Sequence, residues 1–251
     1  MNEINPIALT LGPLQIRWYG ILMSLSFLVG YFILRFLMRE NKIKADAEEY
    51  LIYLIIGILG GARLFEIAYE PMYYLSDPVK ILYVWQGGLA SHGGIIGGAL
   101  ATYLFCRRYK LGFYALADIV VIPIALGAMF VRIGNFINGE IVGRITNVPW
   151  AVKFEGYPGL RHPSQLYEAF KNLVLFFILL DMRKSEAIRS KPGLLFWSFI
   201  GLYSLFRFFV EFFKEYQTLS PGYVLTMGQW LSMPLMLISG IFIYKILNKS
   251  L

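Results

Sequence analysis

The chain has 251 residues, of which 57% are hydrophobic and only 16% are charged, and its mean hydropathy is +0.59. This composition excludes an ordinary soluble domain and indicates a polytopic membrane protein. The formal charge of +7 does not indicate nucleic-acid binding, because the basic residues separate hydrophobic segments and form no single patch.

Seven segments are long and apolar enough to cross a bilayer, whose hydrocarbon core of about 30 Å needs roughly 20 residues in a helix. We therefore expect an all-α integral membrane protein with one domain over residues 1–251. The third segment contains five glycines and directly follows a sixth, Gly87; glycines lower helix propensity but let membrane helices approach closely. The expected spans are residues 15–38, 46–68, 88–106, 113–138, 165–182, 193–213 and 226–247.

The distribution of basic residues predicts the orientation of these spans. Basic residues are concentrated after the first, third and fifth spans and at the C-terminus, whereas the other connections hold few. The positive-inside rule therefore predicts a cytoplasmic C-terminus and an external N-terminus. The longest external connection, residues 140–163, includes a β-prone run at residues 148–154, and we expect it to form a small external cap between spans four and five.

Two features of the second and third spans admit two interpretations each. Arg63 lies three residues before Glu66, so the two form either a buried ion pair that fixes packing or part of a site. His92, at the start of the third span, is followed by Gly93 and Gly94. Bare backbone N–H groups could approach a phosphate there, but a packing surface of small residues explains the same glycines.

The fourth span ends in a polar pattern that favours a binding site. Arg132, Asn135 and Asn138 recur every three residues, and an arginine within the bilayer needs an anionic partner. These polar residues suggest headgroup binding more than helix packing. Glu140 and Arg144 follow where the chain should leave the bilayer, and they could instead be only a solvated pair.

The sixth span carries a second polar pattern. Tyr203, Arg207 and Glu211 are spaced four residues apart, which places them on one side of a helix. An internal Arg207–Glu211 pair with the tyrosine packed above it would explain this spacing structurally. Two arginines in separate spans nevertheless favour a lipid that carries phosphate, because guanidinium groups stay charged and bind phosphate oxygens through two donors.

The motifs resemble those of bacterial prolipoprotein diacylglyceryl transferases, in order and over nearly the whole chain. They are Trp18-Tyr19-Gly20, Ser91-His92-Gly93-Gly94, residues 132–140 with Gly143-Arg144, residues 161–169, Tyr203 with Arg207 and Glu211, and residues 227–232. Two positions depart from the family pattern. Val142 stands where an aromatic residue is common, and Lys214 and Tyr216 stand where an arginine and a proline are frequent. These departures concern the substrate preference of the protein rather than the reaction.

The resemblance implies a seven-helix enzyme of the bacterial cytoplasmic (inner) membrane. Its reaction transfers diacylglycerol from phosphatidylglycerol to the lipobox cysteine of a prolipoprotein signal peptide, forming a thioether and releasing glycerol phosphate, without metal or other cofactor. The resemblance implies functional roles for Arg132, Arg207, His92, Tyr19, Asn135, Glu140, Gly143, Tyr203 and Glu211.

The reaction suggests a role for each group. Arg132 and Arg207 would stabilise charge on the departing phosphate, and Asn135 with the Gly93 and Gly94 backbone would complete the headgroup site. His92 is the candidate base for the substrate thiol, and Glu140 is its rival. Glu211 would orient Arg207.

Two other functions fit the buried charges. An anion or lipid transporter would use the same arginines to pass its substrate, and a noncatalytic scaffold would bind phosphatidylglycerol without product. The single cysteine, Cys106, and two histidines far apart in sequence give no metal-ligand motif.

Overall fold

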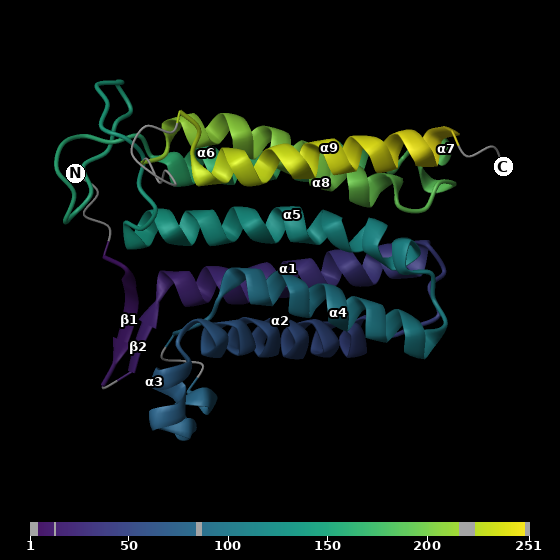
Figure 1. The fold of residues 1–251 in the computed structure, drawn as a ribbon, viewed down its shortest axis with the longest axis horizontal. Helices are drawn as coiled ribbons and strands as arrows, with labels where there is room; N and C mark the ends of the chain where they lie inside the picture. Colours follow the sequence, from purple (N-terminus) through teal and green to yellow (C-terminus); the bar gives the residue numbers. More distant parts are fainter. Residues whose placement is uncertain (1–4, 13, 84–86, 216–223, 249–251) are drawn as a thin grey trace. The chain divides into compact units, whose positions relative to one another are not determined.

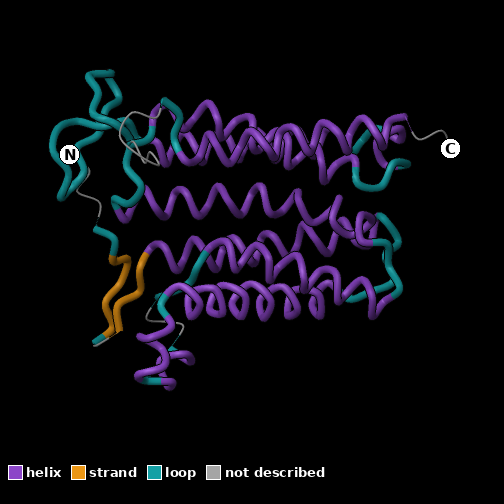
Figure 2. Tube along the Cα trace, viewed as in Figure 1, coloured by secondary structure: helices purple, strands orange, loops and turns teal. Residues whose placement is uncertain are grey.

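The structure is a computed structural model that describes residues 5–12, 14–83, 87–215 and 224–248. Most of these residues are helical, and one β-hairpin precedes the first long helix (Figure 2). The chain divides into two compact units, one of residues 1–33 with 118–251 and the other of residues 34–117.

The hairpin near the N-terminus was not predicted. Strands β1 (Ile7–Leu11) and β2 (Leu14–Arg17) pair antiparallel, with a register irregularity between Ile7 and Leu9. Helix α1 (Trp18–Glu40) therefore begins three residues after the predicted start of the first span. The physical reason is that apolar and polar residues alternate in β2, which favours an extended strand over a helix.

The second unit is built on two helices, α2 (Ala47–Tyr69) and α4 (Ser91–Tyr109), which correspond to the second and third predicted spans. The glycines of α4 lie against α2: a Cβ added at Gly93 or Gly97 would come under 3.0 Å from α2 backbone atoms. The packing interpretation of these glycines is therefore confirmed. After α2 come two short helices, α3 (Pro71–Ser76) and η1 (Pro78–Leu82).

The first unit holds most of the next long helix and all the helices that follow it in the chain (labelled in Figure 1). Asp118 joins two of them, because its carboxylate accepts hydrogen bonds of 2.7 Å from the backbone N–H groups of Gly193 and Phe196 at the start of α8. Trp197 and Phe242 stack with ring centroids 4.2 Å apart, which fastens α8 to α9. These helices are α5 (Phe113–Asn138), α6 (Ser164–Met182), α7 (Glu186–Arg189), α8 (Leu194–Val210), η3 (Glu211–Phe213) and α9 (Met227–Asn248).

Among the described residues, five helices are long and apolar enough to cross a membrane: α1, α2, α5, the α8–η3 segment and α9. The chain is thus a helical multi-pass membrane protein. The helices α4 and α6 form where the third and fifth spans were predicted, and each has 19 residues, but neither is among these five apolar helices. Seven spans and one domain remain predictions.

The predicted external cap contains little regular structure. Residues 140–163 make three isolated β-bridges, Gly143–Lys214, Ile145–Arg161 and Val152–Arg161, of which one involves the β-prone run at residues 148–154. The position of this segment outside a membrane remains a prediction.

Candidate functional site

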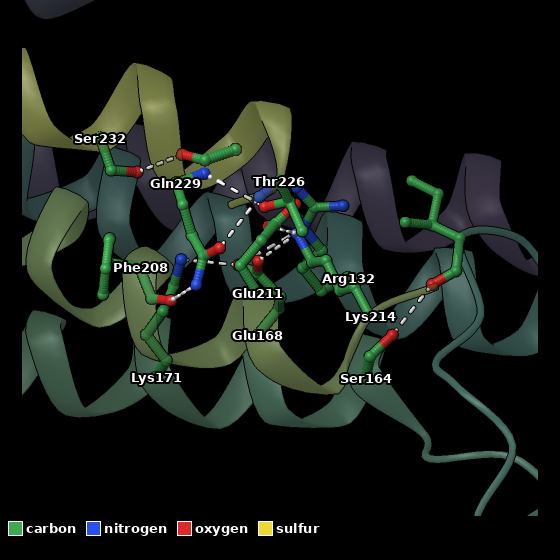
Figure 3. Close-up of polar contacts among 12 residues, drawn as sticks. Arg132, Ser164, Glu168, Lys171, Phe208, Glu211, Lys214, Thr226, Gln229 and Ser232 are labelled. Carbon is green, nitrogen blue, oxygen red and sulfur yellow. Dashed lines mark hydrogen bonds and ion pairs between the residues drawn. The ribbon is translucent and has the colours of Figure 1, made fainter. Parts of the chain in front are cut away.

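A buried carboxylate on α6, Glu168, lies at the centre of the polar residues of the first unit (Figure 3). Its Oε2 is 2.6 Å from Lys171 Nζ, and its Oε1 is 2.7 Å from Lys214 Nζ. Arg132 Nε lies 4.0 Å from Oε2. An unpaired charge buried in this way would cost several kcal/mol, and these three cations offset that cost for the Glu168 carboxylate.

Glu211 supplies a second buried carboxylate, and it differs from the prediction. Lys214 Nζ lies 3.2 Å from Glu211 Oε2, and the described ion pairs include none between Arg207 and Glu211. Helix α8 ends at Val210, and Glu211 begins the 3₁₀ helix η3. Residues three apart align in a 3₁₀ helix, so Glu211 faces Lys214 and the four-residue pattern stops at Arg207.

The motif of residues 227–232, at the start of α9, packs closely against Glu211. A Cβ added at Gly228 would lie under 3.0 Å from the Glu211 carboxylate. The buried Gln229 donates from Nε2 to the Phe208 carbonyl oxygen (3.4 Å) and accepts from Thr226 N–H (3.0 Å). The motif therefore fastens the end of α8 to the beginning of α9.

Arg207 and Tyr203 occupy the same region of α8. The Arg207 Nε is buried and makes no hydrogen bond with the residues that the structure describes. Lys171 Nζ lies 4.0 Å from the centroid of the Tyr203 ring, a cation–π distance. Arg207 therefore keeps a donor that a phosphate oxygen could accept.

The polar end of α5 brings together the residues predicted there. Arg132 Nη1 donates to Asn135 Oδ1 (3.4 Å), and Asn135 Nδ2 donates to Glu140 Oε2 (3.0 Å). Asn138 Nδ2 donates to the other carboxylate oxygen of Glu140 (3.1 Å). Gly139, at φ 68°, turns the chain after the helix, so Glu140 reaches back towards Asn135. Two amides thus orient the Glu140 carboxylate beside the arginine.

Two glycines of the motifs allow close packing. A Cβ at Gly134 would lie under 3.0 Å from the Tyr19 ring, which places this tyrosine against α5. A Cβ at Gly143 would meet the carbonyl oxygens of His162 and Phe213, and Gly143 N–H donates to the first of these (3.1 Å). No larger residue fits either position without a shift of its neighbours.

Arg144 fixes the loop after α5 through two backbone acceptors. Its Nε donates to the Lys214 carbonyl oxygen (2.8 Å), and its N–H donates to that of Phe213 (3.0 Å). Arg161 Nη1 forms a 2.8 Å ion pair with Glu215 Oε1. The loop after α5 is therefore joined to the segment that carries Lys214; Tyr216, the neighbouring departure from the family pattern, lies outside the described residues.

His92 is the second residue of α4 and is exposed, in the unit of residues 34–117. Its role as a base, like a phosphate contact of Gly93 and Gly94, stays a prediction. The described part of the chain holds no group of three or more His, Cys, Asp or Glu side chains able to bind a metal.

Arg63 has a structural set of partners. It is buried and donates to the Tyr74 hydroxyl (2.8 Å), and it also donates to the carbonyl oxygens of Lys80, Ile81, Gly87 and Gly88. The part of the chain that the structure describes shows no ion pair between Arg63 and Glu66, although this pair was one of the two interpretations of the sequence. Five acceptors from the connection after α2 satisfy the guanidinium, so Arg63 holds that connection in place.

Comparison with known proteins identifies the family. The profile of prolipoprotein diacylglyceryl transferase matches residues 6–245. Relatives named phosphatidylglycerol–prolipoprotein diacylglyceryl transferase are 41% identical over 250 residues in Rickettsia africae, covering 96% of each chain, and 43% identical over 245 residues in Geobacter sulfurreducens, covering 94% of this chain and 93% of the relative. The chain belongs to the prolipoprotein diacylglyceryl transferase family.

Sequence reasoning missed part of the buried cluster of this family member. Lys171 was not singled out, although Glu168 and Lys171 form a charged pair three residues apart inside an apolar segment. The same signal had drawn attention to Arg63 and Glu66. Lys214 was noted only as a departure from the family pattern, and the structure places it between two carboxylates.

Proposed function

We propose that this protein transfers the diacylglyceryl group of phosphatidylglycerol to the lipobox cysteine of prolipoproteins, the first step of bacterial lipoprotein maturation. The observation that carries the proposal is the family match over nearly the whole chain. The cluster of Arg132, Arg207, Lys171 and Lys214 around two buried carboxylates supports it, because an anionic headgroup needs such cations in a low-dielectric environment.

In the proposed reaction, the cysteine sulfur forms a bond to the carbon of the diacylglyceryl group that bears the phosphodiester oxygen. The bond between that carbon and the oxygen breaks, and glycerol phosphate leaves with the electron pair. Arg132 and Arg207 stabilise the charge that develops on the phosphate, and Asn135 orients Arg132. Such fixed cations typically lower a barrier by several kcal/mol.

The thiol proton needs an acceptor, for which the chain offers two candidates. Glu140 is held by Asn135 and Asn138, with Asn135 itself bonded to Arg132. This contact supports Glu140 as a base near the headgroup. His92 is the chemically better matched base at neutral pH, and its exposure leaves its ring accessible. Tyr19, Gly143, Tyr203 and Glu211 shape and orient the headgroup site.

We further propose that the protein lies in the bacterial cytoplasmic membrane with seven spans, an external N-terminus, a cytoplasmic C-terminus and an external cap of residues 140–163. The distribution of basic residues supports this orientation. In this orientation the end of α5 that carries Arg132, and Glu140 just after it, would lie on the external side, where a prolipoprotein cysteine would arrive.

A transfer assay tests the function. Purified protein in proteoliposomes receives labelled phosphatidylglycerol and a lipobox peptide, and we expect labelled thioether product. Arg132→Ala and Arg207→Ala should each reduce the rate at least 100-fold, because a lost transition-state charge contact is worth several kcal/mol. Arg39→Ala is the matched control, since Arg39 is exposed at the end of α1.

Three outcomes distinguish the candidate functions. Full transfer activity in either arginine variant would refute the headgroup role. Anion or lipid flux without thioether product would indicate a transporter, and phosphatidylglycerol binding with neither flux nor product would indicate a scaffold. For the base, His92→Gln and Glu140→Gln are compared over a pH series; the variant that loses the pH dependence of the rate identifies the proton acceptor.

A further inference from the structure

The charges of the buried cluster do not balance. Lys171 and Lys214 have side chains 4% and 10% exposed, and their ammonium groups pair with Glu168 and Glu211. The two lysines thus cancel the two carboxylates. Arg132 and Arg207 remain, so these six residues carry a formal charge of +2.

Lys171 matters because Glu168 has another available partner. Arg132 Nε is already 4.0 Å from Glu168 Oε2, the oxygen that Lys171 contacts at 2.6 Å. Without Lys171, this oxygen would attract the guanidinium and reduce its availability to a ligand. The arginine is also the more accessible cation, with a side chain 19% exposed.

We propose that Lys171 is a positioning residue that keeps this cluster at +2, and that the cluster consequently binds the dianionic glycerol phosphate product more tightly than a monoanionic phosphodiester headgroup. Breaking the carbon–oxygen bond of phosphatidylglycerol turns a phosphodiester of charge −1 into a phosphate monoester, which is mostly a dianion above a pKa of about 6. The proposal rests on the proposed function, because it takes that reaction's product as the ligand.

The physical basis is that Coulomb energy scales with the product of the charges. Changing the cluster by one unit alters the binding energy of a dianion twice as much as that of a monoanion. The preference for the dianion therefore changes with cluster charge even when both ligands bind at the same place. Glu140 lowers the local charge by one, but it is unchanged in every variant below.

The test measures binding of two soluble ligands to the full-length protein in detergent at pH 7.5 by calorimetry. Glycerol 1-phosphate is the dianion, and glycerophosphoglycerol, the deacylated headgroup, is the monoanion. Four variants change the cluster charge: Lys171→Met gives +1, Lys171→Met with Glu168→Gln gives +2, Glu168→Gln gives +3, and Lys171→Arg keeps +2.

We expect the ratio of the two dissociation constants to follow this order. Relative to the unmodified protein, the dianion preference should fall on the order of tenfold in Lys171→Met and rise in Glu168→Gln. The dianion preference of the unmodified protein should be retained in Lys171→Arg. The double variant should show the same preference, because its cluster charge is again +2, although it lacks two buried side-chain charges. A purely structural role for Lys171 predicts the opposite, with the double variant no better than Lys171→Met.

The proposal is overturned if the unmodified protein shows no dianion preference or if the ratio does not follow cluster charge. Thermal unfolding of each variant accompanies the titrations, and the double variant and Glu168→Gln keep the test decisive if Lys171→Met fails to fold. Binding requires no turnover, so its failure in a protein with full transfer activity refutes this inference alone. If the unmodified protein shows no transfer activity in the proteoliposome assay, the proposed function is refuted instead.

Discussion

The contact between α2 and α4 can be tested with two neighbouring glycines of one helix. Gly60 and Gly61 both lie in α2, but an added Cβ meets nothing within 4 Å at Gly60, whereas at Gly61 it would lie under 3.0 Å from the Gly93 carbonyl oxygen and from Gly97 Cα. We therefore compare Gly61→Ala with Gly60→Ala, two substitutions of the same size and helix propensity.

The atoms that obstruct the Gly61 Cβ belong to the backbone of α4, so no side chain can rotate away. Restoring an ordinary contact distance requires the helices to separate by about 1 Å, which loosens the dispersion contacts along the interface. Overpacking of this kind typically costs about 1–3 kcal/mol. Membrane helices stay largely helical when they separate, so the propensity difference between glycine and alanine offsets little of this cost.

Thermal and denaturant unfolding in the same detergent should show Gly61→Ala destabilised by that amount and Gly60→Ala within about 0.5 kcal/mol of the unmodified protein. Because Gly93 follows His92, transfer activity of Gly61→Ala should also fall below that of Gly60→Ala. Equal stability of the two variants would refute the close-packing argument, since everything else about the substitutions is matched.

Three further changes probe other parts of the structure. Arg63→Ala should lower stability in detergent by about 1–3 kcal/mol, because the buried Tyr74 hydroxyl and four part-buried carbonyl oxygens lose a charged donor, and unchanged unfolding would contradict its structural role. Gly228→Ala should displace Glu211 and reduce transfer at least tenfold, as read in the labelled-lipid assay; full activity would show that this carboxylate can move. Burial, followed by the charge of Arg144, lowers the pKa of His162, so the neutral ring stabilises the fold above about pH 6.5 and loses that contribution as pH falls through its folded pKa. Melting temperatures from pH 7.5 to 5 should drop more steeply than in His162→Gln, and parallel curves would contradict the shift.

Much of the helical structure follows from the sequence. The fourth span was predicted at residues 113–138, and α5 has these bounds. Long apolar segments between basic connections are a strong signal, because a helix is the simplest way to satisfy backbone groups in a bilayer. The hairpin before α1 was missed because residues 14–17 are only four long and are continuous with an apolar span.

Predicting the partners of charged residues was less successful, and Arg63 shows why. Spacing within one helix suggested Glu66, whereas the arginine reaches oxygens 11–25 residues further along the chain. These acceptors are mostly backbone carbonyls, which every residue has, so no residue type marks them in the sequence. Only the folded connection after α2 makes them visible.

The site combines residues whose positions are predictable to different degrees. Arg132 and Arg207 lie within α5 and α8, where a 3.6-residue period relates sequence to direction. Glu140 and Glu211 come just after the ends of the same two helices, one beyond a glycine with positive φ and the other in a 3₁₀ turn. Helical spacing no longer applies at those positions. The two arginines were therefore found from spacing. The partners of the carboxylates depend instead on how each helix terminates, and this explains why Glu211 pairs with Lys214, beyond the end of α8.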